Sequence, residues 1–221
     1  MKEKRITLIL SIALAVCAGA TIPTLISSIP PVEPYSVKSE VPYCVTPPSV
    51  PEQATFDGET IDLRRYDRRE RMDREMMSFT YMHSTTMLML KRANRYFPIV
   101  EPILKANGIP DDFKYLMVIE SSLNPIARSP AGAAGLWQFM PATGREFGLE
   151  VNDNIDERYN VEKATVAACK YFKQAYEKYG NWMAVSAAYN AGQGRITAQL
   201  DKQLADHAMD LWLVEETSRY M

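Results

Sequence analysis

The sequence is poor in residues that bind metals and has no excess of positive charge. Its 221 residues include three cysteines and two histidines, and His83 and His207 lie far apart. No group of Cys and His has the spacing of metal ligands, so we expect no metal and no cofactor. The 25 Lys and Arg against 27 Asp and Glu give a formal net charge of −2. A nucleic-acid-binding surface needs a basic stripe, so we expect no nucleic-acid partner.

The sequence also lacks a long apolar run near its N-terminus. Ile6–Val16 is apolar but is shorter than the roughly 20 residues that a membrane-spanning helix needs. A positively charged start precedes this run, and small residues at 18–20 follow it, as in a site that signal peptidase cleaves. We predict a secretory signal peptide at residues 1–20. Two alternatives stay open: a lipoprotein signal ending at Cys17, and an uncleaved membrane anchor.

Residues 21–58 are predicted to form a proline-rich tether. Eight prolines lie between Pro23 and Pro51, and proline is excluded from the interiors of helices and sheets. Together with the signal, the tether indicates export to the cell envelope, into the periplasm, and the N-terminus could attach the chain to a membrane. A disulfide between Cys44 and Cys169 stays open, but the pattern favours Cys169 as a small buried apolar residue.

The segment 59–110 is predicted to be a helical extension that packs on the domain after it. Charged residues of both signs alternate in the first half of the helix expected at 67–90, which indicates a solvated face. Its second half is rich in methionine, and Met77, Tyr81 and Leu88 have helical spacing. We predict that this stripe lies in the core.

From residue 91 to residue 106 the helical pattern continues, with apolar residues spaced by four. Pro98 and Pro102 interrupt it, and proline inside a helix removes a hydrogen bond, so a break or kink is expected there. Further amphipathic helices are predicted over 161–179, closed by Gly180, over 182–189, and from Ile196 onward. No run alternates cleanly as a strand should. The fold class is therefore all-α or nearly so.

A single acid occupies the apolar face of another helix, which begins near Pro110. Phe113, Leu116, Met117 and Glu120 follow at i, i+3, i+4 and i+7 and so share one face. Burial disfavours the charged form of a carboxyl group and raises its pKa, so such a glutamate could donate a proton near neutral pH. The structural alternative is a Glu paired with an arginine or placed at a helix end.

A loop of small side chains follows this acid directly, from Ser129 to Gly135. Small residues let a bulky ligand approach the backbone. Trp137 and Phe139 could provide walls, and Gln138 offers both a hydrogen-bond donor and an acceptor. Each residue alone could be core or solvated surface, but together they suggest a sugar-binding cleft.

Four motifs in order carry a resemblance to a known family. They are Glu120–Ser121, Ser129–Gly132, Gly135–Pro141 and Ala188–Gly192. They resemble the soluble-lytic-transglycosylase-like (SLT) catalytic domain of family 23 glycoside hydrolases, in particular its membrane-bound murein transglycosylase D branch. The resemblance covers about Ile61 to the end and implies a mostly helical, goose-lysozyme-like fold with a deep saccharide groove.

The resemblance also implies roles for single residues within a catalytic domain at 111–221. Glu120 matches the catalytic acid/base of the family, and Ser129 and Gln138 match residues that bind the substrate. Tyr189 matches the tyrosine that orients the acid, and Asn190 matches the asparagine next to it in the groove. The segment 156–160 resembles a conserved Asp-Pro-Arg-x-Asn stretch, with Glu157 in place of proline, and we interpret it as structural.

The implied reaction is cleavage of peptidoglycan glycan strands at the β-1,4 bond between N-acetylmuramic acid and N-acetylglucosamine, with a 1,6-anhydro end as product. A glycosidase that uses water normally has two carboxylates. The alternatives are lysozyme-like hydrolysis, if Asp153, Asp156 or Glu157 reached the cleft, and a wall-binding protein without catalysis. The last residues, 215–221, read like the start of a helix that the family continues, so we expect either a truncated domain or a domain that lacks this packing helix.

Overall fold

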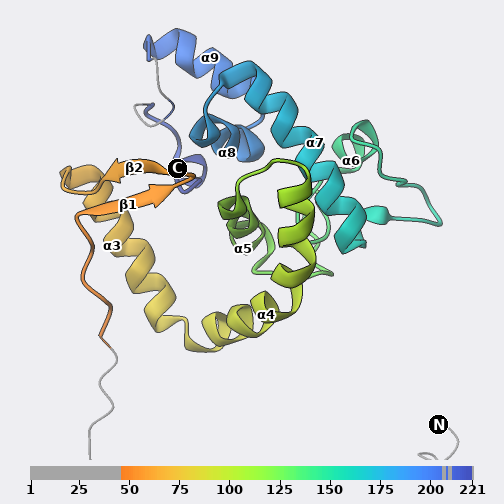
Figure 1. Ribbon diagram of the computed structural model, residues 1–221, viewed down its shortest axis with the longest axis horizontal. Helices are drawn as coiled ribbons and strands as arrows, with labels where there is room; N and C mark the ends of the chain where they lie inside the picture. Colours follow the sequence, from red (N-terminus) through yellow and green to blue (C-terminus); the bar gives the residue numbers. More distant parts are fainter. Residues whose placement is uncertain (1–45, 206–207, 209–210, 221) are drawn as a thin grey trace, which may run out of the picture. The chain divides into compact units, whose positions relative to one another are not determined.

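The computed structural model describes residues 46–205, 208 and 211–220. The predicted signal peptide, the alternative lipidation site at Cys17, most of the tether and Cys44 lie outside the described residues. Within them, the mainly helical fold class is confirmed (Figure 1). The α-helices are α3 (Tyr66–Tyr81), α4 (His83–Ala106), α5 (Leu116–Ser121), α6 (Pro141–Glu146), α7 (Val161–Tyr179), α8 (Trp182–Ala191), α9 (Gln193–Gln203) and α10 (Glu215–Ser218), and the 3-10 helices are η1 (Asp111–Tyr115) and η2 (Glu157–Tyr159).

A short antiparallel hairpin precedes the helices and was not predicted. It joins β1 (Gln53–Phe56) to β2 (Glu59–Asp62) and so crosses the predicted boundary between tether and extension at residue 58. Asp57 and Gly58 form its turn with φ angles of 48° and 77°. Asp-Gly is favoured in two-residue turns because both residues tolerate positive φ. This dipeptide was the signal in the sequence that could have revealed the hairpin.

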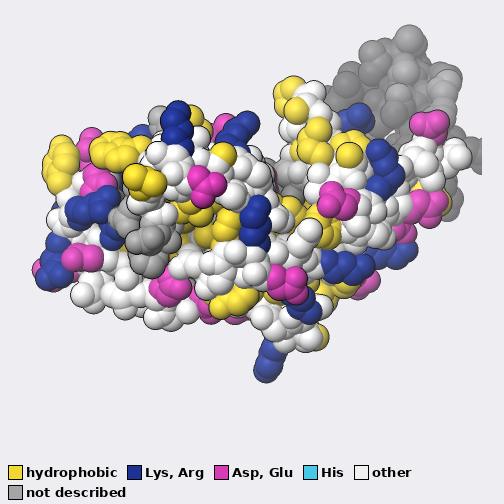
Figure 2. All heavy atoms as spheres, turned by 90° about the horizontal axis from the view of Figure 1, so that it is seen from above, with side chains coloured by type: hydrophobic (Ala, Val, Ile, Leu, Met, Phe, Trp, Pro, Cys, Tyr) yellow, Lys and Arg dark blue, Asp and Glu magenta, His cyan; other side chains and the backbone are white. Residues whose placement is uncertain are grey.

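The predicted helix over 67–90 is divided at Met82 into α3 and α4, and its methionine-rich stripe is not in the core. Met77, Tyr81 and Leu88 are 46%, 54% and 45% exposed, and α3 has no buried residue. That prediction was wrong because periodicity shows which residues share a face, not whether another element covers that face. The first half of α3 carries both acidic and basic side chains. Figure 2 shows acidic and basic side chains interleaved on the face in view.

Of the break or kink expected at the prolines, the break does not occur, since α4 is continuous through Pro98 and Pro102. The apolar spacing within it is confirmed: Tyr96, Val100 and Leu104 are buried. These residues face α7, which packs against both α4 and α8 (Figure 1). The core therefore sits around α7.

The centre of the core is aromatic. Phe113 of η1 is fully buried, with its ring centroid 4.7 Å from that of Phe172 on α7 and 5.1 Å from that of Trp182. Trp137 is also fully buried and donates from Nε1 to Thr165 Oγ1 at 2.9 Å. A buried tryptophan normally pairs its N–H in this way. This cluster fixes η1, and with it the short helix α5.

Helix α7 has the bounds that the sequence predicted, whereas α8 runs two residues further than predicted, to Ala191, and α9 begins at Gln193 and not at Ile196. Asn160 and Asn181 accept hydrogen bonds from backbone N–H groups in the first turns of α7 and α8. Gly180 closes α7 in the left-handed conformation. Cys169 is a buried free cysteine, and burial raises the pKa of its thiol to about 11. In the described part of the chain, no helix combines the length and the apolar character needed to cross a membrane.

Candidate active site

Glu120 lies at the end of α5, where the sequence predicted an acid on an apolar face. Phe113, Leu116 and Met117 on that face are buried, with at most 2% of each exposed. The helix ends one residue after Glu120, because Ser122 and Leu123 take positive φ angles of 51° and 56°. The carboxyl group is therefore presented at a helix end with hydrophobic packing behind it.

The environment of Glu120 keeps its carboxyl group protonated to an unusually high pH. Burial is the largest effect and raises the pKa of Glu120 to about 7, with a hydrogen bond from Tyr220 acting in the opposite direction. The negative charge of Glu216 raises this pKa further. A charge in a poorly solvated place is costly, so the neutral form is favoured.

The hydroxyl of Tyr220 donates to Glu120 Oε1 at 3.0 Å, across 100 residues of sequence. Burial and the nearby Glu120 raise the pKa of this hydroxyl, so it stays a donor. Sequence reasoning missed Tyr220. It lies in the stretch 215–221, where no periodic pattern connects it to the acid.

The segment that carries Tyr220 is held by polar contacts to two helices. Ser186 Oγ on α8 donates to the carbonyl oxygen of Tyr220 at 2.6 Å, and Thr217 Oγ1 donates to Asn190 Oδ1 at 2.9 Å. A hydrogen bond with the Asn190 side chain also lowers the pKa of Tyr220. Asn190, a predicted site residue, therefore belongs to one network with Tyr220 and Glu120.

Tyr189, predicted to orient the acid, has a different hydrogen-bond partner in this structure. Its hydroxyl donates to the carbonyl oxygen of Trp137 at 2.6 Å. Its ring packs edge-on to Trp137 and Phe139. Burial, and then the charge of Glu120, raise the pKa of Tyr189, so its hydroxyl lies within electrostatic reach of the acid. Its orienting role stays a prediction.

The loop of small residues is tied into a compact turn that uses the two other predicted residues. Ser129 Oγ accepts from the backbone N–H of Ala133 at 3.0 Å. Gln138 has a positive φ of 48°, and its Nε2 donates to the Gly135 carbonyl at 2.8 Å. Within the described part of the chain, the Ser129 hydroxyl proton and Gln138 Oε1 have no partner. These two groups remain able to bind a ligand.

Arg158 anchors this loop from beneath. The arginine is only 4% exposed, and its Nη1 donates to the carbonyls of Gly132 and Phe139 at 2.7 and 2.9 Å. Asp156 neutralises it through two further hydrogen bonds. The carbonyl of Arg158 passes so close to Gly135 that a Cβ there would lie 1.9 Å from it. The structural interpretation of the segment 156–160 is confirmed.

Comparison with known proteins places the chain in a family. A model of the transglycosylase SLT domain matches residues 97–209, which is just over half of the chain. The chain therefore belongs to the transglycosylase SLT domain family. The hairpin, α3 and the segment with Tyr220 lie outside the matched residues.

Three relatives show the extent of the similarity. The membrane-bound lytic murein transglycosylase D of Escherichia coli K12 is 32% identical over 69% of this chain and 34% of that protein. The soluble lytic murein transglycosylase of the same strain is 35% identical over 39% of this chain and 15% of that protein. The crystal structure of the 70 kDa soluble lytic transglycosylase of E. coli gives a TM-score of 0.43 at 29% identity, covering 49% of this chain and 19% of that chain. This chain spans about a third of the length of the D transglycosylase.

The raised pKa of Glu120 predicts a pH-dependent stability. The folded protein keeps the Glu120 proton up to about pH 7, whereas the unfolded chain releases it near the ordinary value of 4.5. Because the folded state binds more protons in that window, its free energy of unfolding falls as the pH rises from about 4.5 to 7. Glu120→Gln removes this loss. Its stability relative to the wild type should rise between pH 4 and pH 8 by up to about 3 kcal/mol, measured by urea unfolding.

The matched control is Glu177→Gln, on the exposed side of α7. This variant should show no such change between the two pH values. A stability difference for Glu120→Gln that is the same at pH 4 and pH 8 would contradict the raised pKa.

Proposed function

We propose that the chain is a peptidoglycan lytic transglycosylase with Glu120 as its single acid/base. It would cleave the β-1,4 bond between N-acetylmuramic acid and N-acetylglucosamine and leave 1,6-anhydro-muramic ends. The observation that carries the proposal is the half-buried Glu120 with a pKa of about 7, in a chain of the SLT domain family. The names of the relatives, which refer to lytic murein transglycosylases, support the same activity.

A pKa near 7 suits both halves of such a reaction. The protonated Glu120 would donate to the glycosidic oxygen as the bond to C1 of the muramic acid breaks. The resulting carboxylate would then take the proton from the C6 hydroxyl, whose oxygen bonds to C1 and closes the anhydro ring. Acid–base catalysis works best when the pKa of the group lies near the operating pH. No water is consumed, and Glu120 returns to its protonated form.

The other predicted residues would bind the sugar chain around this group. The Ser129 hydroxyl and Gln138 Oε1 would contact the substrate from the loop, and Asn190 and Tyr189 from α8. Tyr220 would position Glu120, because its hydroxyl holds one carboxyl oxygen and leaves the other for the substrate. No group of Cys, His, Asp and Glu that could hold a metal occurs among the described residues, and the proposal uses none.

The acids that could serve as a second carboxylate, Asp153, Asp156 and Glu157, are engaged elsewhere or exposed. Asp156 pairs with Arg158, and Glu157 pairs with Lys163 and accepts from the Glu150 N–H. Asp153 is exposed in a loop. These contacts support a reaction with one carboxylate over hydrolysis. Glu216, whose charge reaches Glu120, is the acid that a hydrolytic reaction would use instead.

The proposed setting is the cell envelope, in the periplasm, with glycan strands as the partner. We propose residues 1–20 as a signal segment, the residues from 21 to the start of the hairpin at Gln53 as the tether, the segment from the hairpin to residue 110 as the extension and 111–221 as the catalytic domain. The relatives named as membrane-bound support attachment to a membrane.

The products of purified protein incubated with wall sacculi test the reaction. We expect muropeptides with anhydro ends, identified by mass spectrometry. Glu120→Gln should reduce their release by about 10²–10⁴-fold or more, because it removes general acid–base catalysis. Glu177→Gln serves as the matched control and should keep wild-type activity. Reducing ends as the main product would indicate a lysozyme, and binding without release would indicate a wall-binding protein.

Tyr220→Phe tests the positioning of the acid. The hydroxyl of Tyr220 favours the carboxylate form of Glu120, so its loss should raise the pKa of Glu120. The alkaline limb of the kcat/KM profile should then move to higher pH, measured on isolated glycan strands. Tyr115→Phe is the control, because Tyr115 is half exposed and its ring contacts Phe97 and Lys114. An unshifted alkaline limb in Tyr220→Phe would contradict the positioning role.

A further inference from the structure

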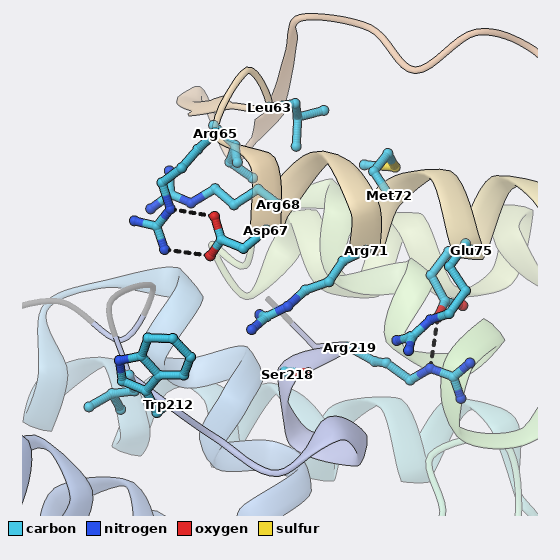
Figure 3. Close-up of a pocket in the computed structure, with 13 residues that line it drawn as sticks. Leu63, Arg65, Asp67, Arg68, Arg71, Met72, Glu75, Trp212, Ser218 and Arg219 are labelled. Carbon is cyan, nitrogen blue, oxygen red and sulfur yellow. Dashed lines mark hydrogen bonds and ion pairs between the residues drawn. The ribbon is translucent and has the colours of Figure 1, made fainter.

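A cavity lies between α3 and the segment 211–220, outside the residues matched by the family model (Figure 3). Its volume is about 160 Å³, enough for a carboxylate group with a short aliphatic stretch. Its lining combines apolar side chains with several arginines. The residues that line it are Ile61, Leu63, Arg65, Asp67, Arg68, Arg71, Met72, Arg74, Glu75, Leu211, Trp212, Ser218 and Arg219.

The charge on this cavity wall is predominantly positive. Five arginines line the cavity against two acids. Asp67 pairs with Arg65, and Glu75 pairs with Arg219 and Arg74. Both acids are therefore already neutralised by arginines of the same wall, and the cavity would attract an anion.

Arg71 is the arginine best placed to bind that anion. In Figure 3 its side chain leaves α3 and extends into the space between Trp212 and the backbone at Ser218. It makes no ion pair or hydrogen bond with another described residue. A guanidinium group is suited to binding a carboxylate through two parallel hydrogen bonds. A ligand carboxylate at this point would therefore have a ready partner.

The neighbouring surfaces indicate what would be attached to the carboxylate. Trp212 is 85% exposed and presents a flat apolar face beside Arg71 (Figure 3). Leu63 and Leu211, which also line the cavity, are buried. An arginine without a partner among the described residues, set beside an aromatic face in a wall rich in arginine, fits a carboxylate-bearing residue of a short peptide.

The cavity is joined to the candidate active site by the chain itself. Ser218 and Arg219 line it, and the next residue, Tyr220, donates to Glu120. A polymer whose sugar lay at Glu120 could therefore reach the cavity with a side branch. In peptidoglycan that branch is a peptide that carries several carboxylates.

We propose that this cavity binds a carboxylate of the acidic stem peptide on the glycan strand being cleaved, with Arg71 as the anchor and Trp212 as the apolar wall. The proposal rests on the proposed function. It assigns to the N-terminal helix α3 a part in substrate selection, so the chain would cleave peptide-bearing strands better than bare ones.

The test compares two substrates: glycan strands with their stem peptides, and the same strands after an amidase has removed the peptides. The measured quantity is the ratio of kcat/KM on peptide-bearing strands to kcat/KM on bare strands. Arg71→Ala should lower this ratio about tenfold through KM, the effect expected when a charged hydrogen-bonded pair is lost. Arg71→Lys should lower it less, because the charge remains without the planar fork.

The matched control is Arg69→Ala, because Arg69 is exposed on the same helix and does not line the cavity. It should keep the wild-type ratio. Trp212→Ala, a change at an exposed side chain, provides a second variant that should fold normally and should also lower the ratio. The proposal would be overturned if Arg71→Ala and Trp212→Ala had the same ratio of kcat/KM on peptide-bearing to bare strands as Arg69→Ala.

Direct binding separates this proposal from the proposed function. Calorimetry with a free tetrapeptide that carries the stem carboxylates should show binding to the full chain and its loss in Arg71→Ala. Binding would stand even if the wild type released no anhydro product, and in that case only the function would fail. A second measurement uses phosphatidylglycerol vesicles. If the wild type binds the vesicles but not the peptide, and Arg71→Ala loses vesicle binding, the peptide proposal is overturned in favour of a lipid surface.

Discussion

The hydrogen bond between the Tyr220 hydroxyl and the buried carboxyl group of Glu120 is the interaction on which the site depends. Apolar packing behind α5 makes the charged carboxylate costly and raises its pKa to about 7. The tyrosine opposes that effect and fixes one oxygen at 3.0 Å. Burial without this hydrogen bond would raise the pKa further. The combination gives a group that can give up a proton and take it back near neutral pH.

The rest of the structure keeps these two residues together. The aromatic core around Phe113 holds α5, and Ser186 on α8 holds the backbone of Tyr220. Arg219 connects the same segment to Glu75 on α3 at 2.8 Å. The acid thus depends on parts of the chain that are far apart in sequence. On the other side, the buried Arg158 donates to the carbonyl oxygens of Gly132 and Phe139 and so fixes the loop that carries Ser129.

The sequence predicted the features that depend on local spacing and missed those that depend on distant contacts. The apolar face that carries Glu120 and the ends of α7 are local patterns, and both were found. The burial of the Met77 stripe was wrongly predicted, because covering a face requires a partner element that periodicity does not identify. Tyr220 was missed for the same reason: its partner lies 100 residues away. The structural role of Arg158 was predicted from its motif, but its bonds to the loop carbonyls required the fold.

The most direct test of the account is the pKa of Glu120 itself. The full chain would be labelled with ¹³C at the glutamate side-chain carboxyl groups and titrated by NMR, with Glu120→Gln used to assign the signal. The account predicts a midpoint near 7 for this carboxyl group, well above the ordinary value for a glutamate. A midpoint near the ordinary value of 4.5 would show that the carboxyl group is well solvated, and it would contradict its role as the single acid and base.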